Sequence, residues 1–260
     1  MGAFRARLLV GATALLLALL PVAGRAQQRE PTSVPREIVL VSEEWENYTQ
    51  ANGTGLGWDV LRHVFEPRGV TVRASTVPYL RAVGLVSRGD ADAWVGAYLD
   101  EAPDTLYPKW PYDVDEVYAL GLADTLPPTL ASLGYFRVAW MRGYQFERYL
   151  PHITEFNEVR RRDSILSMLE LRRADLYIDA KTEIDNLLRR TPRPDHFRAT
   201  FLTTLPLYLS FTNSARGRAL RALYDQRMEE LVRSGELKAI FERWKHPYPF
   251  EEPTAGFPGK

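Results

Sequence analysis

Short apolar runs alternate with segments of helical periodicity, and this alternation constrains the fold more than any other feature of the chain. Residues 38–41, 70–77 and 91–95 predict strands, while the apolar residues within 60–65 recur at helical spacing. Pro78 stands where it can open a second helix. Because parallel strands need crossover connections, this β-α-β-α-β series predicts an α/β fold in which a mostly parallel sheet is flanked by helices.

A second series of the same kind follows the proline pair 127–128. Residues 136–141 and 176–178 predict strands, and residues 144–150 predict a short helix. Residues 163–164, Asp and Ser, can cap a further helix with one apolar stripe. In both series the chain leaves a helix and enters a buried strand through an Asp, so we expect two similar lobes.

The last part of the chain predicts a strand, two helices and a tail. A strand over residues 201–211 leads into a helix whose apolar face spans residues 220–232 and which Gly235 ends. A second helix over 237–244 has the same spacing of apolar residues. The prolines and glycines beyond it indicate that residues 249–260 form a flexible tail.

The amino terminus has the pattern of a signal peptide. Arg5 and Arg7 precede an apolar run over 8–20, and small residues follow Pro21. At 13 residues the run is too short for a membrane-spanning helix, which needs about 20. We therefore expect residues 1–26 to be cleaved near Ala26 and the mature protein to be exported to a periplasm.

Composition excludes several classes of function. The chain has no cysteine, so it forms no disulfide, uses no thiol nucleophile and carries no lipid anchor through a thiol. Lysine and arginine together number 33, as do aspartate and glutamate, which leaves no positive surplus for nucleic acid. Aromatic residues reach 12%, a supply that can line a ligand cleft or fill a core.

The familiar motifs of metal, nucleotide and hydrolase sites give weak signals or none. Residues 53–57 are glycine-rich but too far from the preceding strand for a dinucleotide site, so we interpret them as a turn. The arginines at 160–162 are interpreted as a solvated helix edge. The histidines lack the spacing of zinc ligands, so neither a metal nor a cofactor is expected. The four histidines are His63, His152, His196 and His246.

The segments that follow the predicted strands are the candidate ligand site. In open α/β sheets ligands bind beyond the carboxyl ends of strands. Residues 43–48, 96–101, 142–145 and 179–181 occupy those positions and are rich in aromatic and acidic side chains. A cleft lined this way favours an amine or another cation between aromatic faces. Alternatively, Asp179 only caps the helix at Lys181.

Five segments in this order resemble family 3 of the bacterial extracellular solute-binding proteins, the periplasmic receptors of ABC importers for polar amino acids. They are residues 55–59, 87–93, 137–143, 168–175 and 231–237. The resemblance spans residues 36–244. It implies a two-lobed type II periplasmic-binding-protein fold with a discontinuous first lobe. We expect this lobe to comprise residues 35–121 and 206–248, and the second lobe residues 122–205.

The resemblance also implies roles for individual residues. Trp45 and Tyr48 match the aromatic residues that sandwich a ligand side chain, Tyr144 lies in the turn that receives the ligand carboxylate, and Asp179 matches the acid that binds the α-amino group. The family's carboxylate-clamping arginine is missing from the stretch 101–104. This departure favours an amine, a modified amino acid or a peptide-like solute over an ordinary amino acid.

Substitutes for the missing arginine and other polar or aromatic residues near the strand ends complete the candidate ligand-binding set. The set is Glu44, Trp45, Tyr48, Arg81, Trp94, Tyr98, Asp100, Lys109, Arg142, Tyr144 and Asp179. Arg81 and Lys109 are the candidate substitutes, although lysine offers a point charge rather than a fork.

The sequence thus predicts a monomeric, non-enzymatic solute-binding protein that closes its lobes on a small polar solute and delivers it to an ABC permease. Two alternatives stay open. One is a periplasmic dehydratase or lyase on the same fold, with Asp100 or Glu44 as general acid. The other is a ligand receptor for a membrane sensor.

Overall fold

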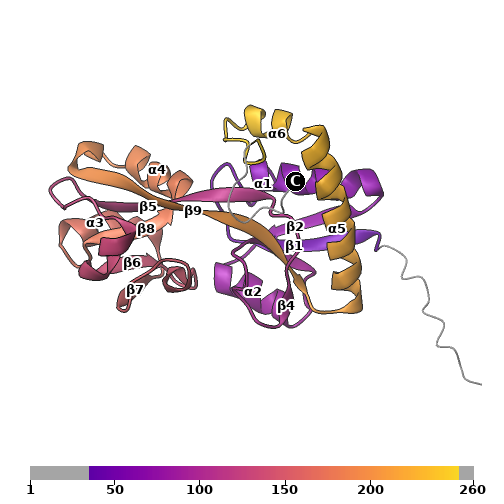
Figure 1. Ribbon diagram of the computed structural model, residues 1–260, viewed down its shortest axis with the longest axis horizontal. Helices are drawn as coiled ribbons and strands as arrows, with labels where there is room; N and C mark the ends of the chain where they lie inside the picture. The colour runs from indigo at the N-terminus through magenta and orange to yellow at the C-terminus, as the bar shows by residue number, and fades with distance from the viewer. Residues whose placement is uncertain (1–34, 252–260) are drawn as a thin grey trace, which may run out of the picture. The chain divides into compact units, whose positions relative to one another are not determined.

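The computed structural model describes residues 35–251, which Figure 1 draws in colour. The predicted signal peptide, residues 1–26, lies outside the described residues, and so do residues 252–260 of the predicted tail. Within the described part of the chain, no helix has the length and apolar character needed to cross a membrane.

The first lobe is built on three parallel strands. β1 (Glu37–Ser42) lies between β2 (Thr71–Thr76) and β3 (Ala93–Ala97) and is parallel to both. This confirms the β-α-β-α-β series predicted from the sequence. A short strand, β4, pairs with β9 (Phe197–Thr212). The bounds of β4 and of the helices of this lobe are β4 Thr105–Leu106, α1 Leu56–Phe65, α2 Tyr79–Ser87, α5 Ala215–Ser234 and α6 Lys238–Arg243.

The second lobe repeats the plan with a smaller set of elements. β8 (Leu176–Ala180) lies between β6 (Val138–Met141), to which it is parallel, and β5 (Asp113–Leu122), to which it is antiparallel. β6 also pairs with β7, which is parallel to it. The helix predicted over 144–150 is a single 3-10 turn at Phe146–Arg148. The remaining elements of this lobe are β7 Phe156–Val159, α3 Ile165–Glu170 and α4 Lys181–Arg190.

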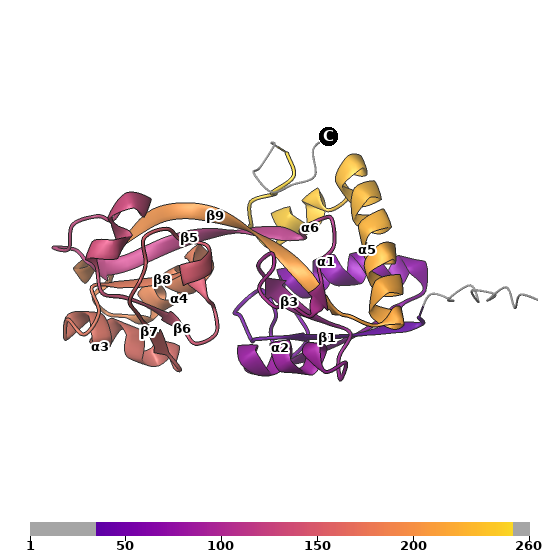
Figure 2. The ribbon, with the colours of Figure 1, turned by 60° about the horizontal axis from the view of Figure 1, so that its bottom comes forward.

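Two long strands, β5 and β9 (Phe197–Thr212), join the lobes. β9 pairs antiparallel with β5 up to Leu207 and then with β3 from Tyr208, so one strand passes from the sheet of one lobe into the sheet of the other. Figures 1 and 2 both show β5 and β9 running together between the lobes. Residues 117–121 of β5 pair with β8, next to the lobe boundary that the sequence predicts at 121–122.

The helices of the first lobe form because their apolar residues share one face. Trp58, Leu61 and Phe65 of α1 are fully buried, and each such burial contributes about 1.5–3 kcal/mol. At the start of α5 the Ser214 side chain accepts a hydrogen bond from a backbone N–H. The same helix ends, as predicted, at Gly235, whose φ of 73° is left-handed.

The described beginning of the predicted tail packs against the first lobe. The Phe250 side chain is 7% exposed, and its ring centroid lies 6.4 Å from that of Phe241 and 5.3 Å from that of Tyr248. The prolines around Phe250 gave no indication of this contact, because a periodicity argument needs a helix or a strand to act on.

Candidate functional site

A cavity of about 50 Å³ lies where the two lobes meet. This volume exceeds the 10–15 Å³ or so that one water molecule requires. As expected for an α/β sheet, the walls come largely from residues at or just beyond the ends of β1, β3, β6 and β8. The cavity brings together five of the predicted site residues, Trp45, Tyr48, Tyr98, Tyr144 and Asp179.

Aromatic rings from both lobes line this cavity. The centroids of Trp45 and Tyr79 lie 6.2 Å apart, and those of Tyr79 and Tyr144 lie 5.2 Å apart. Across the lobes, the indole Nε1 of Trp45 donates a hydrogen bond of 3.0 Å to the hydroxyl of Tyr144. Such rings offer flat apolar faces together with polar groups at their edges.

The glycine-rich segment 53–57 supports one of these rings. Gly55 has a φ of 129°, and a Cβ there would lie 2.2 Å from the carbonyl oxygen of Tyr48. At Gly57 a Cβ would lie 3.1 Å from the Tyr48 ring. The segment is therefore a turn, as interpreted from the sequence, and its lack of side chains lets the chain carrying Tyr48 fold back onto α1.

Asp179, at the end of β8, is a buried acceptor of several hydrogen bonds. Its side chain is only 2% exposed. One carboxylate oxygen accepts from the hydroxyl of Tyr177 and from Nε of Arg162, at 3.3 Å in the latter case, and the other accepts from the backbone N–H of Ala180 at 2.9 Å. α4 begins at Lys181 without a side-chain cap. Asp179 therefore lies in the cavity wall and does not cap the helix.

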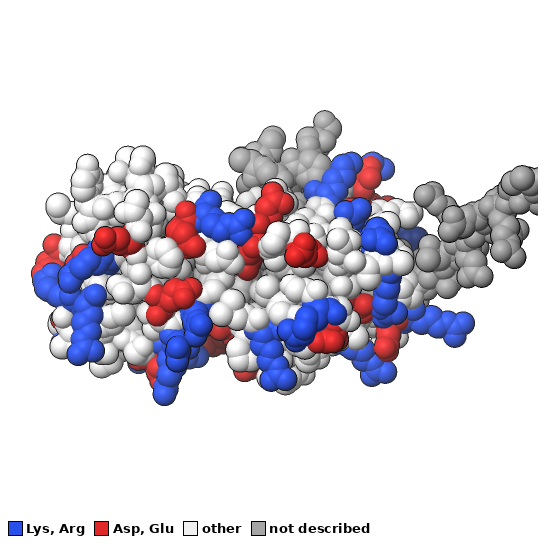
Figure 3. Space-filling view, turned by 90° about the horizontal axis from the view of Figure 1, so that it is seen from below, with Lys and Arg blue, Asp and Glu red and all other residues white. Residues whose placement is uncertain are grey.

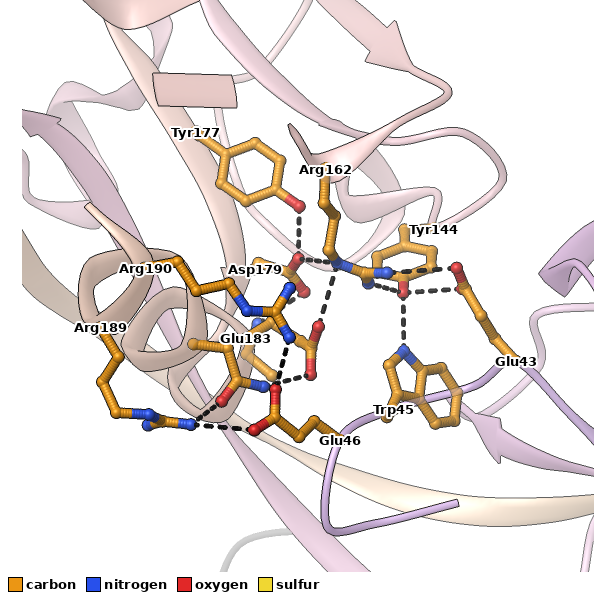
Figure 4. A network of polar contacts seen from close by, with 12 residues as sticks. Glu43, Trp45, Glu46, Tyr144, Arg162, Tyr177, Asp179, Glu183, Arg189 and Arg190 are labelled. Carbon is orange, nitrogen blue, oxygen red and sulfur yellow. Dashed lines mark hydrogen bonds and ion pairs between the residues drawn. The ribbon is translucent and has the colours of Figure 1, made fainter. Parts of the chain in front are cut away.

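Arg162 is the main departure from the sequence interpretation. The arginines at 160–162 were expected to form a solvated helix edge, and this is wrong for Arg162, whose side chain is 19% exposed. Figure 4 shows its guanidinium pointing into a network of polar side chains. Nε lies 3.1 Å from Glu183 and 3.3 Å from Asp179, and Nη1 lies 3.1 Å from Glu43.

This network keeps Arg162 charged. Burial opposes the charge, but the surrounding Tyr144, Asp179, Tyr177 and Glu183 outweigh it and raise the pKa of Arg162 well above its usual value. The reach to Glu43, 119 residues away, had no local signature.

A second polar group lies along β5. The hydroxyl of Tyr48 donates to Asp113 at 2.6 Å, and the hydroxyl of Tyr98 donates to Asp115 at 2.8 Å. His246, beyond α6, places Nε2 3.3 Å from the Asp113 carboxylate. Asp115 and His246 line the cavity, and neither was among the predicted site residues.

Burial perturbs the ionisation of this second group. It raises the pKa of Asp115 to about 7, with Asp113 and Asp179 adding to the effect and the Tyr98 hydroxyl opposing it. Burial also opposes the charged form of His246, but the Asp113 carboxylate outweighs burial and raises the pKa of His246. Neutral and charged forms of Asp115 are therefore both accessible near neutral pH.

Glu101 lies in the stretch 101–104, from which the family's carboxylate-clamping arginine is missing. It is 3% exposed. Its carboxylate accepts a hydrogen bond of 2.7 Å from the hydroxyl of Tyr79 and one of 3.2 Å from the backbone N–H of Tyr98. Burial raises its pKa to about 7. Glu101 holds two cavity-lining residues in position from behind the wall.

Three of the predicted residues lie outside the cavity because their side chains face either the core or the surface. Trp94, on β3, faces the core, is fully buried and contacts Tyr107 edge-to-face at 6.5 Å. Arg81 lies on the exposed side of α2. Glu44 is exposed and accepts from the backbone N–H of Ala51 at 3.1 Å.

Three more of the predicted residues are surface residues. Asp100 has a left-handed φ of 60°, and its carbonyl, rather than its carboxylate, accepts from Arg148 at 2.7 Å. Lys109 is exposed and is held through its backbone N–H. Arg142 is exposed and lies 4.0 Å from Glu158. Neither Lys109 nor Arg81 replaces the missing arginine in the cavity.

Charge elsewhere on the protein is mixed in sign. Figure 3 shows Lys and Arg interspersed with Asp and Glu on one face, so this face presents no continuous positive surface to a nucleic acid backbone. Over residues 35–251, no three His, Asp or Glu side chains are grouped so that they could hold a metal ion.

No family model matches the chain, and no curated protein matches it in sequence. Solved structures do match it. A histidine kinase sensor domain with similarity to periplasmic binding proteins is 18% identical and has a TM-score of 0.67, with 81% of this chain and 96% of that chain covered.

Two further structures illustrate the range of proteins with this fold. A substrate-binding protein of an ABC uptake transporter from Streptococcus pneumoniae, with bound histidine, is 15% identical with a TM-score of 0.64, and the match covers 80% of this chain and 92% of that one. An ancestral amino-acid-binding protein, a precursor of cyclohexadienyl dehydratase, is 14% identical with a TM-score of 0.62, with 80% and 95% covered.

At such identities these likenesses establish the fold alone. The nine strands of residues 35–251, and the two lobes that β5 and β9 join, agree with that likeness. The chain has the α/β fold of the type II periplasmic binding proteins.

Proposed function

We propose that this chain is an exported solute-binding protein of the family 3 type that closes its two lobes on a small polar solute bearing an amine. The observation that carries this proposal is the composition of the cavity, whose wall contains five tryptophan and tyrosine rings and three carboxylates. The proposed ligand contacts are those five predicted residues that line it, together with three that the structure adds. The added residues are Tyr79, Asp115 and Glu183.

The balance of charge around the cavity supports an amine. Arg162 is in contact with three carboxylates, from Glu43, Asp179 and Glu183. Asp115 adds a fourth acid to the cavity, and no arginine within residues 35–251 forms an ion pair with it. A cationic group beside Asp115 and Asp179 would gain attraction in a partly desolvated site and would contact aromatic faces.

Lobe closure is the proposed working motion. β5 and β9 join the lobes, so bending within these strands would open and close the cavity. The lobe boundaries predicted from the sequence, at 121–122 and 205–206, remain part of this proposal. We propose that the closed form is presented either to an ABC permease or to a membrane sensor, the two kinds of system to which the similar structures belong.

A thermal-shift screen of the purified chain tests this proposal. Amines, amino acids and short peptides would be added separately and the melting temperature measured for each. A ligand at about 100 times its dissociation constant contributes about 2.7 kcal/mol of stability. A shift with amines supports the proposal, and no shift with any amine at millimolar concentration contradicts it.

A second candidate function is an enzyme of the dehydratase or lyase type. Asp115 favours it, since a cavity carboxyl with a pKa of about 7 can donate a proton near neutral pH. The residues first considered for this role, Asp100 and Glu44, are exposed and outside the cavity. Conversion of a bound compound during prolonged incubation, lost in Asp115→Asn, would favour the enzyme over the binding protein.

A further inference from the structure

Glu43 reaches across the cleft from the first lobe to the second. It follows β1, and its two carboxylate oxygens contact separate partners on the second lobe (Figure 4). One oxygen lies 3.1 Å from Nη1 of Arg162, and the other accepts a hydrogen bond of 2.9 Å from the hydroxyl of Tyr144. A guanidinium and a hydroxyl are the donors that a solute carboxylate would also require.

The partners of Glu43 are already engaged, because Arg162 contacts three carboxylates and the Tyr144 hydroxyl has no hydrogen-bonding position left. The Tyr144 hydroxyl donates to Glu43 and accepts from both Trp45 and Arg162, which uses its one donor and two acceptor positions. Arg162 directs Nε toward Asp179 and Glu183, Nη1 toward Glu43 and Nη2 toward Tyr144.

A solute carboxylate would therefore be a fourth anion beside one guanidinium. It would have to displace Glu43 or lie close to it, and either arrangement costs free energy because unpaired charge in a partly desolvated site is unfavourable. An amine without a carboxylate meets no such conflict, since it can contact Asp115 and Asp179 while Glu43 stays on Arg162.

We propose that Glu43 provides, from within the chain, the carboxylate that joins the lobes through Arg162 and Tyr144, and that it thereby makes the cavity selective for amines that lack a carboxylate. This specificity rests on the proposed function. Each such amine is the decarboxylation product of an amino acid. Glu43 acts as a selectivity residue because it excludes the carboxylate of that parent amino acid.

Glu46 offers a matched control. It is also an acid in the segment after β1, and it also reaches the second lobe, with its carboxylate 2.6 Å from Nη2 of Arg190 and 3.7 Å from Nη2 of Arg189. Glu43 contacts Tyr144 in the cavity wall, whereas Glu46 pairs with two arginines on α4 that do not line the cavity. Glu46→Gln removes a similar charge and a similar contact between the lobes without touching Arg162.

The experiment compares each amine with its parent amino acid. Dissociation constants of agmatine and arginine, cadaverine and lysine, and histamine and histidine are measured by calorimetry for the wild type, Glu43→Gln and Glu46→Gln. We expect the wild type to prefer the amine of the pair that it binds. In Glu43→Gln the ratio of the dissociation constant of the amino acid to that of its amine should fall about tenfold or more, because a hydrogen bond to a charged group is worth about 1.5–3 kcal/mol. Glu46→Gln should leave the ratio unchanged.

The outcomes separate this inference from the proposed function. If amines bind but Glu43→Gln leaves the ratio unchanged, or if the wild type binds the parent amino acid at least as tightly, the inference is wrong and the proposed function stands. If no amine binds, the proposed function fails and the inference fails with it. Should Glu43→Gln not fold, Glu43→Asp keeps the charge but shortens the reach to Arg162, and it should narrow the same ratio.

Discussion

The indole of Trp45, three residues beyond the end of β1, lies directly against the backbone of Gly96 in β3. A Cβ at Gly96 would come within 2.5 Å of Cη2 and 2.8 Å of Cζ3 of the indole ring. Real Cβ atoms do not approach other atoms so closely, so only glycine leaves room for the indole in this position. Gly96 thus positions the aromatic wall of the cavity.

Gly96→Ala should therefore weaken binding more than it weakens the fold. The methyl group would displace Trp45 from the cavity wall, and we expect the affinity for a confirmed amine to fall about tenfold or more. Gly89→Ala is the control, because Gly89 has a similar φ, 79° against 86°, but a Cβ there would meet its nearest neighbour at 3.7 Å. Both variants should lose about 1–2 kcal/mol of stability from the left-handed backbone. Equal affinities in the two variants would contradict the role given to Gly96.

Trp45 and Trp94 should separate binding from folding. Trp45→Phe keeps an aromatic ring but removes the Nε1 donor to Tyr144, so the affinity should fall about two- to tenfold. Trp94→Phe leaves a space in the core and should lower the free energy of unfolding by about 1–3 kcal/mol with the affinity unchanged. Calorimetry and chemical denaturation measure the two quantities. If Trp94→Phe lost more affinity than Trp45→Phe, Trp94 would have to be assigned to the binding site.

The order of strands and helices was predictable because it depends on local patterns. The strands at 38–41 and 91–95 and the end of a helix at Gly235 follow from periodicity and from the backbone freedom of glycine, both of which act over a few residues. The segments flanking the cavity were likewise predictable, because the carboxyl ends of parallel strands meet at one edge of a sheet.

The identity of the side chains that line the cavity, and of those that hold its wall from outside, was only partly predictable. Arg162 belongs to a run of three arginines, and its contact with Glu43 joins residues 119 positions apart, so no local pattern indicates it. His246 follows the last helix and meets Asp113 from a distance of 133 residues, so no spacing rule connects them. Trp94 was misplaced because β3 is buried on both faces, and alternation does not then distinguish core from cleft.

Asp179→Asn should reduce amine binding strongly. Removing one member of a buried charged network costs about 2–5 kcal/mol, which corresponds to a loss of affinity of about thirtyfold or more. Asp185→Asn is the control, because Asp185 lies one helical turn beyond Lys181 in an exposed pair of the kind that contributes little. If the affinity of Asp179→Asn matched that of Asp185→Asn, the carboxylate of Asp179 would have a structural role only.

Binding of a cation should become tighter as the pH rises through about 7. Asp115, with a pKa of about 7, is largely protonated at lower pH and attracts a cation only when it is ionised. A primary amine, with a pKa of about 10, stays charged throughout. The apparent affinity should therefore be about tenfold lower at about pH 6 than at about pH 8.

The stability of the protein without added solute should change in the opposite direction. Burial raises the pKa of Asp115, Glu101 and Glu183 to about 7 in the folded chain, above their values in the unfolded chain. Between about pH 4 and 7 the folded state then binds more protons, so these groups make the protein less stable as the pH rises. The raised pKa of His246 acts in the same direction, since its favourable charge is lost as the pH rises through that pKa.

Asp115→Asn tests both effects. The variant should bind the amine more weakly, with an affinity that changes little between about pH 6 and 8. Its free energy of unfolding should also decline less steeply with pH than that of the wild type, because one of the three buried carboxyls no longer ionises. The groups that surround Asp115 are unchanged in this variant, so the comparison with the wild type isolates the Asp115 carboxyl. They are Asp113, Asp179, His246 and the Tyr98 hydroxyl. An affinity that is as pH-dependent in Asp115→Asn as in the wild type would assign the titration to Glu183 or His246, which also line the cavity.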